Sequence, residues 1–406
     1  NIGEAAAPFA HPVVFLLLGG FLIGLALEKW NLHRRIAFHI ILNVGSRPLT
    51  LIAGQMLATA FLSMWITKTA TTIMVLPIAM SLIAVVTLNG TRGKGEAANF
   101  GTAMMLGIAY AASIGGMASL VGSPTNLLAA SYLEEVFSIE MTFARWMLFA
   151  RPISAVLLGC ADLVLTRIAF PVSNSLGAVK PGLIEGMLYE MGPMSGPERR
   201  VCAVFAAVAI CWIFSPLVEG RLGFDISDTV IALVGAIALF TIPAIWPDRT
   251  FLLDGSVVRR VPWEVLILFG GGLSLAKAID GSGLAFWIGN CLSFLNAMPL
   301  FVLIFGVTLL VVLLTELMSN TATVAAFLPI AGSLALGSDL SPLLFVLPIA
   351  LAASSAFMLP VATPPNTLVF GTGYVTLPQM MRAGALVNLF GAAIIAGAVT
   401  LAARFL

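Results

Sequence analysis

Two short polar segments interrupt long apolar stretches of this sequence, and their residue types are the ones best suited to chemistry. Thr67-Lys68-Thr69 breaks the apolar region 49–88, and Ser319-Asn320-Thr321 breaks the region 300–337. Where a helix breaks inside hydrocarbon, its unpaired backbone groups need a solute, an ion, water or a side chain as partner. The free N–H groups that begin a helix favour an anion, and the free carbonyls that end one can coordinate Na⁺. Two such tips suit a solute with two anionic ends and an accompanying cation.

Two proline motifs mark further breaks in helices. They are Gly122-Ser123-Pro124-Thr125-Asn126 and Ala362-Thr363-Pro364-Pro365-Asn366. Proline lacks a backbone N–H and clashes with the preceding turn, while Asn126 and Asn366 can hydrogen-bond the freed backbone groups. A proline kink in an ordinary span is the alternative for either motif alone. The match between the two motifs favours broken helices.

The composition places these segments in a membrane. Of the 406 residues, 60% are apolar and 10% are charged, whereas soluble domains carry about 25% charged residues. The formal net charge of +1 gives no nucleic-acid signature, and the four cysteines show neither metal-ligand nor disulfide-framework spacing. The chain begins at Asn1 without a signal-peptide pattern, so we expect that an upstream portion is missing.

Spanning helices need ~20 mostly apolar residues. Such stretches lie at 12–28, 99–121, 146–170, 200–218, 228–246, 263–280, 341–361 and 382–403, and a shorter apolar stretch lies at 284–299. The interrupted regions 49–88 and 300–337 carry Pro77 and Pro329 downstream of their polar centres. We expect both regions to be helical hairpins that enter the membrane and turn back.

Basic residues in the loops predict the orientation. They concentrate in the segments 29–47, 89–98, 171–200 and 247–262, which the positive-inside rule places in the cytoplasm. The segments 29–47 and 89–98 can share a side only if the region between them enters and returns. Loop charge therefore favours the hairpin independently of the polar tip.

The two halves of the chain match each other in order. When Thr67-Lys68-Thr69 is laid on Ser319-Asn320-Thr321, Leu76-Pro77-Ile78-Ala79 falls on Leu328-Pro329-Ile330-Ala331, and the proline motifs align after one gap. Paired interruptions in duplicated halves point to a transporter binding site near the midplane, and loop charge indicates that the repeats are inverted. We expect an all-α polytopic membrane protein with a first repeat at 1–170, connecting and scaffold helices at 171–262, and a second repeat with the last helix at 263–406. The broken helices are expected at about 99–135 and 341–371.

The chain resembles the divalent anion:sodium symporter family of dicarboxylate, citrate and sulfate carriers. The resemblance rests on the two tips, on the run Ser354–Val369 and on Trp30-Asn31-Leu32-His33-Arg34-Arg35, and it covers essentially all 406 residues. It implies a homodimer in which a scaffold holds a mobile transport domain that moves like an elevator. Family members usually have further helices before the segment at 12–28, which agrees with a missing start.

Matching positions carry the family's site residues onto this chain. The resemblance implies that substrate carboxylates lie against both tips, at Thr67, Thr69, Ser319, Asn320 and Thr321, with Ser123 and Thr363 nearby. It implies one sodium site at Ser63, Thr67, Lys68 and Gly122, and a second at Thr315, Ser319, Asn320 and Ala362.

Lys68 departs from the family pattern, which commonly has Ser-Asn-Thr at the first tip. A lysine near the membrane midplane costs ~2.5 kcal/mol or more, so it needs a partner or a role. Its ammonium replaces the first Na⁺, or contacts the substrate carboxylate in an exchanger that never returns empty, or snorkels away. We predict weaker Na⁺ dependence than in a carrier with two intact tips, and a Hill coefficient of two or more for Na⁺ would contradict this. Of the two sodium sites, the second is the one expected to be kept.

Glu316, three residues before the second tip, is also expected inside the membrane. It either tunes a cation site, pairs with Lys68 or Lys277, or accepts hydrogen bonds from hairpin backbone. Only three histidines are present, which argues against a proton relay or a metal site.

The sequence fits three other classes of membrane protein less well. An intramembrane enzyme would need a motif such as Gly-x-Ser-x-Gly or His-Glu-x-x-His, and neither occurs. A channel fits paired buried hairpins less well than alternating access, and a sodium/proton antiporter would carry acidic residues at the broken helices. The substrate stays open among succinate, malate, fumarate, 2-oxoglutarate, citrate and sulfate, as does symport versus exchange. The short loops fit a bacterial inner membrane.

Overall fold

The computed structural model describes residues 2–89, 94–173, 182–222, 227–245, 250–284, 287, 298–338 and 340–403. Within these ranges, 6 helices are long and apolar enough to cross a membrane, at Pro12–Lys29, Lys68–Val86, Gly95–Met117, Phe143–Ala169, Asn320–Gly337 and Leu377–Ala402. Long apolar helices of this kind satisfy their backbone hydrogen bonds internally, as a membrane demands. The predicted all-α polytopic class is thus supported.

The first part of the chain contains a hairpin and a broken helix. Its elements are α1 (Ile2–Ala6), η1 (Ala7–Ala10), α2 (Pro12–Lys29), α3 (Leu32–Val44), α4 (Pro48–Ser63), α5 (Lys68–Asn89), α6 (Lys94–Met117) and α7 (Pro124–Phe137). The turn between α4 and α5 holds Thr67, and the break between α6 and α7 holds Gly122 and Ser123. Proline begins α2, α4 and α7, where its missing N–H is tolerated.

The middle of the chain connects the two hairpin regions. It contains α8 (Phe143–Leu163), the π-helix η2 (Val164–Ala169), α9 (Leu183–Glu190), α10 (Gly196–Leu222), α11 (Asp228–Thr241) and η4 (Gly255–Arg260). A small antiparallel ribbon of β1 (Pro243–Ile245) and β2 (Thr250–Phe251) follows α11.

The last part repeats the order of the first. It contains α12 (Trp263–Gly281), the hairpin α14 (Leu300–Thr315) and α15 (Asn320–Ser338), the broken pair α16 (Leu343–Ala353) and α17 (Pro364–Gly371) with η6 (Pro360–Ala362) between them, and α18 (Leu377–Ala402). The second hairpin turns at Ser319 and the second break spans the segment from Ser354 to Thr363.

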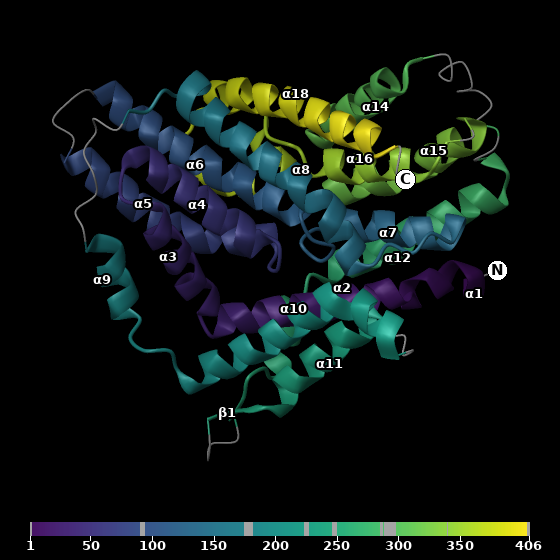
Figure 1. Cartoon of the computed structure of the whole chain (residues 1–406), viewed down its shortest axis with the longest axis horizontal. Coiled ribbons are helices and arrows are strands. Elements are labelled where there is room, and N and C mark those ends of the chain that lie inside the picture. The colour runs from purple at the N-terminus through teal and green to yellow at the C-terminus, as the bar shows by residue number, and fades with distance from the viewer. Residues whose placement is uncertain are drawn as a thin grey trace.

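The helices of both halves meet in one body (Figure 1). The α4–α5 hairpin packs on α6, and the α14–α15 hairpin packs on α16 and α18, while α2, α10 and α11 pack together in the lower part of the view. Small residues allow the closest approaches, because a Cβ on Gly115 would overlap the backbone of Ala60, and one on Gly384 would overlap that of Phe357.

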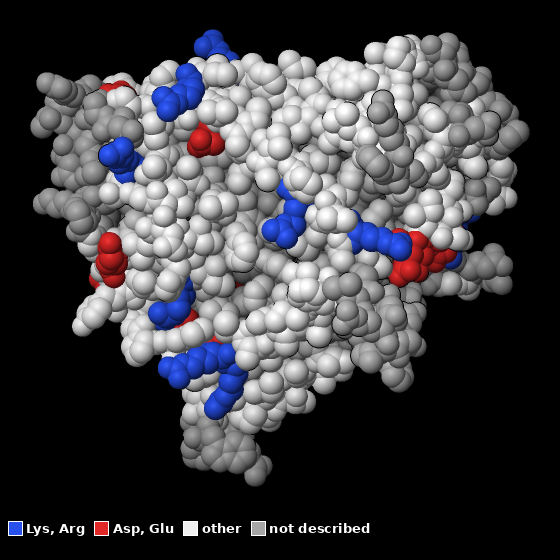
Figure 2. All heavy atoms as spheres, in the orientation of Figure 1, with Lys and Arg blue, Asp and Glu red and all other residues white. Residues whose placement is uncertain are grey.

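Charge is sparse on the face shown in Figure 2, where uncharged side chains cover most of the area. Large exposed apolar side chains lie on several of the spanning helices, for example Leu148 on α8 and Val234 on α11. A surface of this kind is stable against lipid and costly against water.

Several details of the predicted elements were wrong. The expected span 341–361 ends at Ala353, because the break in the helix begins after that residue, and the expected span 228–246 ends at Thr241 before the β ribbon. The basic segment 29–47 is largely the helix α3, and α9 lies in the segment 171–200. Most of the short apolar stretch 284–299, with Cys291, and Arg92 and Lys180 lie outside the described residues.

Candidate functional site

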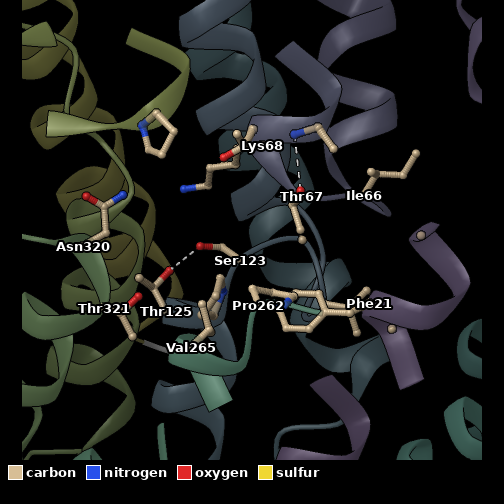
Figure 3. A pocket seen from close by; sticks show the side chains of 18 of the residues that line it. Phe21, Ile66, Thr67, Lys68, Ser123, Thr125, Pro262, Val265, Asn320 and Thr321 are labelled. Atoms are coloured by element: carbon tan, nitrogen blue, oxygen red, sulfur yellow. Dashed lines mark hydrogen bonds between the residues drawn. The ribbon is translucent and has the colours of Figure 1, made fainter. Parts of the chain in front are cut away.

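One cavity of about 660 Å³ lies where both hairpin tips and both broken helices meet. Its walls come from opposite parts of the sequence, as the labelled residues in Figure 3 show. The tip and broken-helix residues in its wall are Thr67, Lys68, Thr69, Ala70, Gly122, Ser123, Pro124, Thr125, Ser319, Asn320, Thr321, Ala362 and Pro364. The facing wall comes from α2, η4 and α12.

The first tip presents the beginning of α5 to this cavity. Thr67 accepts a hydrogen bond at its Oγ1 from the N–H of Ala70 at 3.3 Å, and its carbonyl accepts from the N–H of Thr71 at 3.0 Å. The positive end of the helix dipole therefore faces the cavity together with Lys68 and Thr69. This is the arrangement that stabilises a bound anion.

Lys68 points into the space between the two tips (Figure 3). Its Nζ donates to Ser354 Oγ at 3.2 Å, and its alkyl chain packs on Gly116, where an added Cβ would lie 2.8 Å from Lys68 Cε. No carboxylate lies within ion-pair distance of Lys68 in the described part of the chain. The side chain therefore does not snorkel out of the site, and its charge stays available to an anion.

A cluster of three hydroxyls joins the two broken helices beside Lys68. Ser354 Oγ lies 3.3 Å from Ser123 Oγ and 3.0 Å from Thr125 Oγ1, and the last two lie 2.8 Å apart. Hydroxyls both donate and accept, so this cluster can turn donors toward an anion. Neither Thr125 nor Ser354 was among the predicted site residues, although both belong to motifs that the sequence analysis singled out.

The second tip has a matching geometry. Thr315 Oγ1 lies 2.8 Å from Asn320 Oδ1 and 2.9 Å from the carbonyl of Ala353, and at the first tip Ser63 Oγ donates to the carbonyl of Ala112 at 2.5 Å. Ser63 and Thr315 are the last residues of the first arms of their hairpins. Each hydroxyl contacts a carbonyl of the helix that precedes a break, α6 or α16. The two hairpins are thus held to the two broken helices in the same way.

Oxygen atoms gather around Gly122. A Cβ at this position would lie 2.8 Å from the carbonyl oxygen of Gly116, 2.9 Å from that of Ser63 and 3.0 Å from Ser119 Oγ. Ser119 Oγ also donates to the carbonyl of Met64 and accepts from the N–H of Gly122. Carbonyl and hydroxyl oxygens are ligands that suit Na⁺ at a broken helix.

The two asparagines of the proline motifs hold the unwound segments. Asn126 Nδ2 donates to the carbonyls of Gly116 at 2.9 Å and Ser119 at 2.8 Å. Asn366 Nδ2 donates to the carbonyls of Ala356 at 3.0 Å and Leu359 at 2.9 Å. Both side chains are buried and lie behind the cavity wall. They satisfy carbonyls that would otherwise be unpaired in an apolar interior.

Glu316 caps the second unwound segment. Its carboxylate accepts hydrogen bonds from the N–H groups of Phe357, Met358 and Leu359 at 2.7–2.9 Å, and from Asn388 Nδ2 at 2.7 Å. Among the roles that the sequence allows for Glu316, the structure matches a carboxylate that accepts hydrogen bonds from backbone. The backbone is that of the broken helix, however, rather than that of the hairpin. Lys277 pairs instead with Glu135 at 2.8 Å.

The remaining predicted residues lie just behind the wall. Ser63, Thr315, Thr363, Pro365 and Asn366 do not line the cavity, and Thr363 caps α17 by accepting from the N–H of Asn366 at 3.3 Å. The predicted site residues therefore come together around one cavity, in an inner layer that faces it and an outer layer that shapes it.

Trp65 borders the cavity beside the first tip. Its ring stacks on Phe143 with centroids 5.9 Å apart and meets Phe205 edge-on at 5.1 Å. Its indole Nε1 is buried and has no hydrogen-bond partner among the described residues. The tip thus contacts both α8 and α10 through one aromatic side chain.

The chain is similar to known proteins over nearly its whole length. The whole chain, residues 1–406, matches the family described as the sodium:sulfate symporter transmembrane region. It is 37% identical over 400 residues to the sodium-dependent dicarboxylate transporter SdcS of Staphylococcus saprophyticus, which covers 97% of this chain and 77% of that transporter. It is also 37% identical over 399 residues to SdcS of Staphylococcus aureus strain USA300, covering 97% of this chain and 76% of that one.

Proposed function

Because this chain belongs to the sodium:sulfate symporter family, we propose that it carries a small dianion, a di- or tricarboxylate, across the membrane with Na⁺. The observation that supports this most is the single cavity of about 660 Å³ into which both hairpin tips open. Two helix beginnings and one ammonium face the same space, which suits a solute with two carboxylates. The similarity to sodium-dependent dicarboxylate transporters favours a dicarboxylate such as succinate, malate or fumarate.

In this proposal the substrate lies between the two tips. One carboxylate binds at Thr67, Thr69 and Lys68, and the other at Ser319, Asn320 and Thr321, with Ser123 close by. Thr363 acts from behind by capping α17. The donors are mostly neutral hydroxyls and amides, so the bound dianion can leave without breaking several permanent ion pairs.

Each hairpin tip has a candidate cation site, formed by residues of the tip and of the neighbouring broken helix. At the second tip, Thr315, Ser319, Asn320 and Ala362 supply hydroxyl, amide and carbonyl oxygens, and no lysine stands among them. At the first tip, Ser63, Thr67 and Gly122 supply similar oxygens, but the alkyl chain of Lys68 packs against Gly116 beside them. We therefore assign Na⁺ to the second site and propose that the Lys68 ammonium substitutes for Na⁺ at the first.

We also propose that the two halves are inverted repeats with an elevator-type movement in a homodimer. The equivalent hydrogen bonds of Ser63 and Thr315, and those of Asn126 and Asn366, support the repeat relationship. The cavity lies between the hairpin tips and a wall formed by α2, η4 and α12. A transport domain that slides on a scaffold would have to move across the contacts of α2 with the first tip and of α12 with α15.

A second candidate is Na⁺-independent exchange of dicarboxylates, and it is favoured by Lys68, whose ammonium lines the cavity without a carboxylate partner among the described residues. An ammonium that loses its anion would be left without a charged partner in a water-poor site, which makes the empty carrier costly. An exchanger avoids that state because it returns loaded. A sulfate carrier is a further alternative, since sulfate is also a dianion.

Radiolabelled succinate uptake into proteoliposomes tests these proposals, with and without a Na⁺ gradient and with and without internal succinate. Accumulation in empty vesicles driven by inward Na⁺ establishes symport. Uptake that ignores Na⁺ but requires internal succinate establishes exchange. Uptake of sulfate in place of succinate would overturn the dicarboxylate assignment, and absence of any dianion uptake would overturn transport through this cavity.

A further inference from the structure

Two ion pairs connect the end of α2 to the segment that precedes α12. Lys29 Nζ lies 2.6 Å from Asp254 Oδ2, and Arg260 Nη2 lies 2.6 Å from Glu28 Oε1. The two pairs join the same two elements and have similar length. If the only role of both pairs were to hold α2 and η4 together, breaking either pair should have the same effect on the protein.

Only one of the two pairs belongs to the cavity. Glu28 and Arg260 line it, whereas Lys29 and Asp254 do not. The Arg260 side chain is 51% exposed and that of Glu28 is 30% exposed, so both partners of this cavity-lining pair are accessible to solvent. Glu264 also lines this wall and has no ion-pair partner among the described residues.

Charge in the cavity wall is therefore arranged in two places. Lys68 lies between the tips, and Arg260 lies on the wall formed by α2, η4 and α12, with its side chain about half exposed. An arginine keeps its charge at every physiological pH and has five donors for carboxylate oxygens. Its present partner Glu28 is partly exposed, and ion pairs that are accessible to solvent are weak enough to exchange partners.

We propose that Arg260 is a positioning residue that draws the dianion into the cavity, and that Glu28 competes with the anion for its guanidinium. This inference rests on the proposed transport function. Charges at the edge of a binding site act mainly on the rate of association and on its salt dependence. Arg260 should therefore govern KM at low ionic strength and leave the turnover of the loaded carrier nearly unchanged.

The test compares Arg260→Gln and Glu28→Gln in succinate uptake by the reconstituted full chain. We expect Arg260→Gln to raise KM about tenfold at low ionic strength, with kcat within about twofold. Glu28→Gln frees Arg260 and should lower KM. Both variants break the same ion pair, so a purely structural pair would shift KM in the same direction in both.

Matched controls come from the neighbouring residues. Arg259→Gln removes an adjacent exposed charge that does not line the cavity, and Asp254→Asn breaks the second ion pair. Both should keep KM within about twofold of the wild-type value. Raising ionic strength with choline chloride at constant Na⁺ should shrink the difference between Arg260→Gln and wild type, because salt screens exposed charges.

Three results would overturn the inference. The first is an equal change of KM in Arg260→Gln and Arg259→Gln. The second is a change of KM with the same sign in Arg260→Gln and Glu28→Gln. The third is a KM difference between Arg260→Gln and wild type that does not depend on ionic strength. Wild-type vesicles that take up no succinate would instead contradict the proposed function itself, so the two failures are distinguishable.

Discussion

The ammonium nitrogen of Lys68 lies 3.2 Å from the hydroxyl oxygen of Ser354, which ties a charge on the first hairpin to the broken helix of the second half. Ser354 in turn contacts Ser123 and Thr125 of the first broken helix. Lys68 on the first hairpin is thus connected by hydrogen bonds to both broken helices, so three of the four segments that form the site meet at this point. Any substitution at Lys68 changes both the local cation site and the contact between the halves.

Lys68→Asn should strengthen the dependence of succinate uptake on Na⁺. Removing the ammonium opens the first cation site, so the Hill coefficient for Na⁺ should rise from about one toward two, the limit set by two sites. Uptake measured against external Na⁺ concentration checks this. Lys277→Asn, whose residue pairs with Glu135 outside the cavity, serves as control and should keep the wild-type curve. An unchanged curve in Lys68→Asn would show that Lys68 does not substitute for Na⁺.

Glu316→Gln should destabilise the protein by about 1.5–3 kcal/mol, the range for hydrogen bonds to charged groups. The carboxylate accepts from three backbone N–H groups and from Asn388, and an amide would place its own donors against some of them. Thermal unfolding in detergent measures the effect. Glu134→Gln, at an exposed position of α7, should change stability by no more than about 0.5 kcal/mol. Equal stability of the two variants would mean that the hydrogen bonds from residues 357–359 to the Glu316 carboxylate do not contribute to stability.

Asn126→Asp and Asn366→Asp should each lower uptake strongly, because aspartate has nearly the same shape but cannot donate to the carbonyls that the amide holds. We expect a stability loss of about 1–3 kcal/mol from the unsatisfied buried carbonyls. Asn99→Asp loses a single hydrogen bond to Pro171 near the surface and should be close to wild type. If only one of the two buried variants were impaired, the equivalence of the two breaks would be contradicted.

Gly115→Ala should destabilise the protein by about 1–3 kcal/mol, the usual cost of overpacking a close contact. The new Cβ would overlap the backbone of Ala60, which is held in α4 and has little room to move. Gly159→Ala on α8 is the matched control, because nothing lies within 4 Å of the added Cβ there. That substitution should be neutral or raise stability by up to about 1 kcal/mol through better helix propensity. Comparable unfolding temperatures in the two variants would contradict the close α4–α6 contact.

His33 predicts a loss of stability in mild acid. Burial holds the pKa of its imidazole below the ordinary value of 6.5, and the hydrogen bond with the carbonyl of Leu27 opposes this. His33 is the second residue of α3, outside the candidate spans. Below pH 6.5 His33 takes up a proton in the unfolded chain but stays neutral in the folded chain. The stability that depends on neutral His33 is therefore complete above pH 6.5 and declines as the pH falls toward the pKa of the folded state.

The slope from this residue is at most about 1.4 kcal/mol per pH unit. Unfolding temperatures of wild type and His33→Asn, compared between pH 7.5 and pH 5, isolate it, because the asparagine can keep the hydrogen bond to Leu27 but does not titrate. The variant should be less sensitive to acid than wild type. Parallel pH profiles would show that His33 is not buried in the neutral form.

The helical membrane class and both interrupted regions could be predicted from the sequence. Polar tripeptides and prolines inside apolar runs are locally costly, so Thr67-Lys68-Thr69 and Pro364-Pro365 identify breaks without any knowledge of tertiary contacts. The helix α3 was missed because its arginines and histidines made the segment 29–47 resemble a loop. Its apolar residues Ala37, Phe38 and Ile41 are buried nonetheless.

The partners of the site residues could not be predicted, because they depend on contacts between distant parts of the chain. Glu316 meets Asn388 across 72 residues, and Arg260 meets Glu28 across 232. Lys68 could be assigned three roles from the sequence, and only its contact with Ser354, 286 residues away, shows that the side chain stays inside the site. Local patterns give the breaks in the helices, whereas packing decides what each break contacts.

The aromatic contacts of Trp65 make the first tip an optical probe of its own surroundings. Its indole is held between Phe143 on α8 and Phe205 on α10, beside the cavity. Indole fluorescence is sensitive to such neighbours, so a displacement of the tip relative to α10 would change the wavelength and the intensity of Trp65 emission. With the other six of the seven tryptophans replaced by phenylalanine, the native Trp65 would report substrate-dependent movement in real time, and no foreign dye would have to be attached.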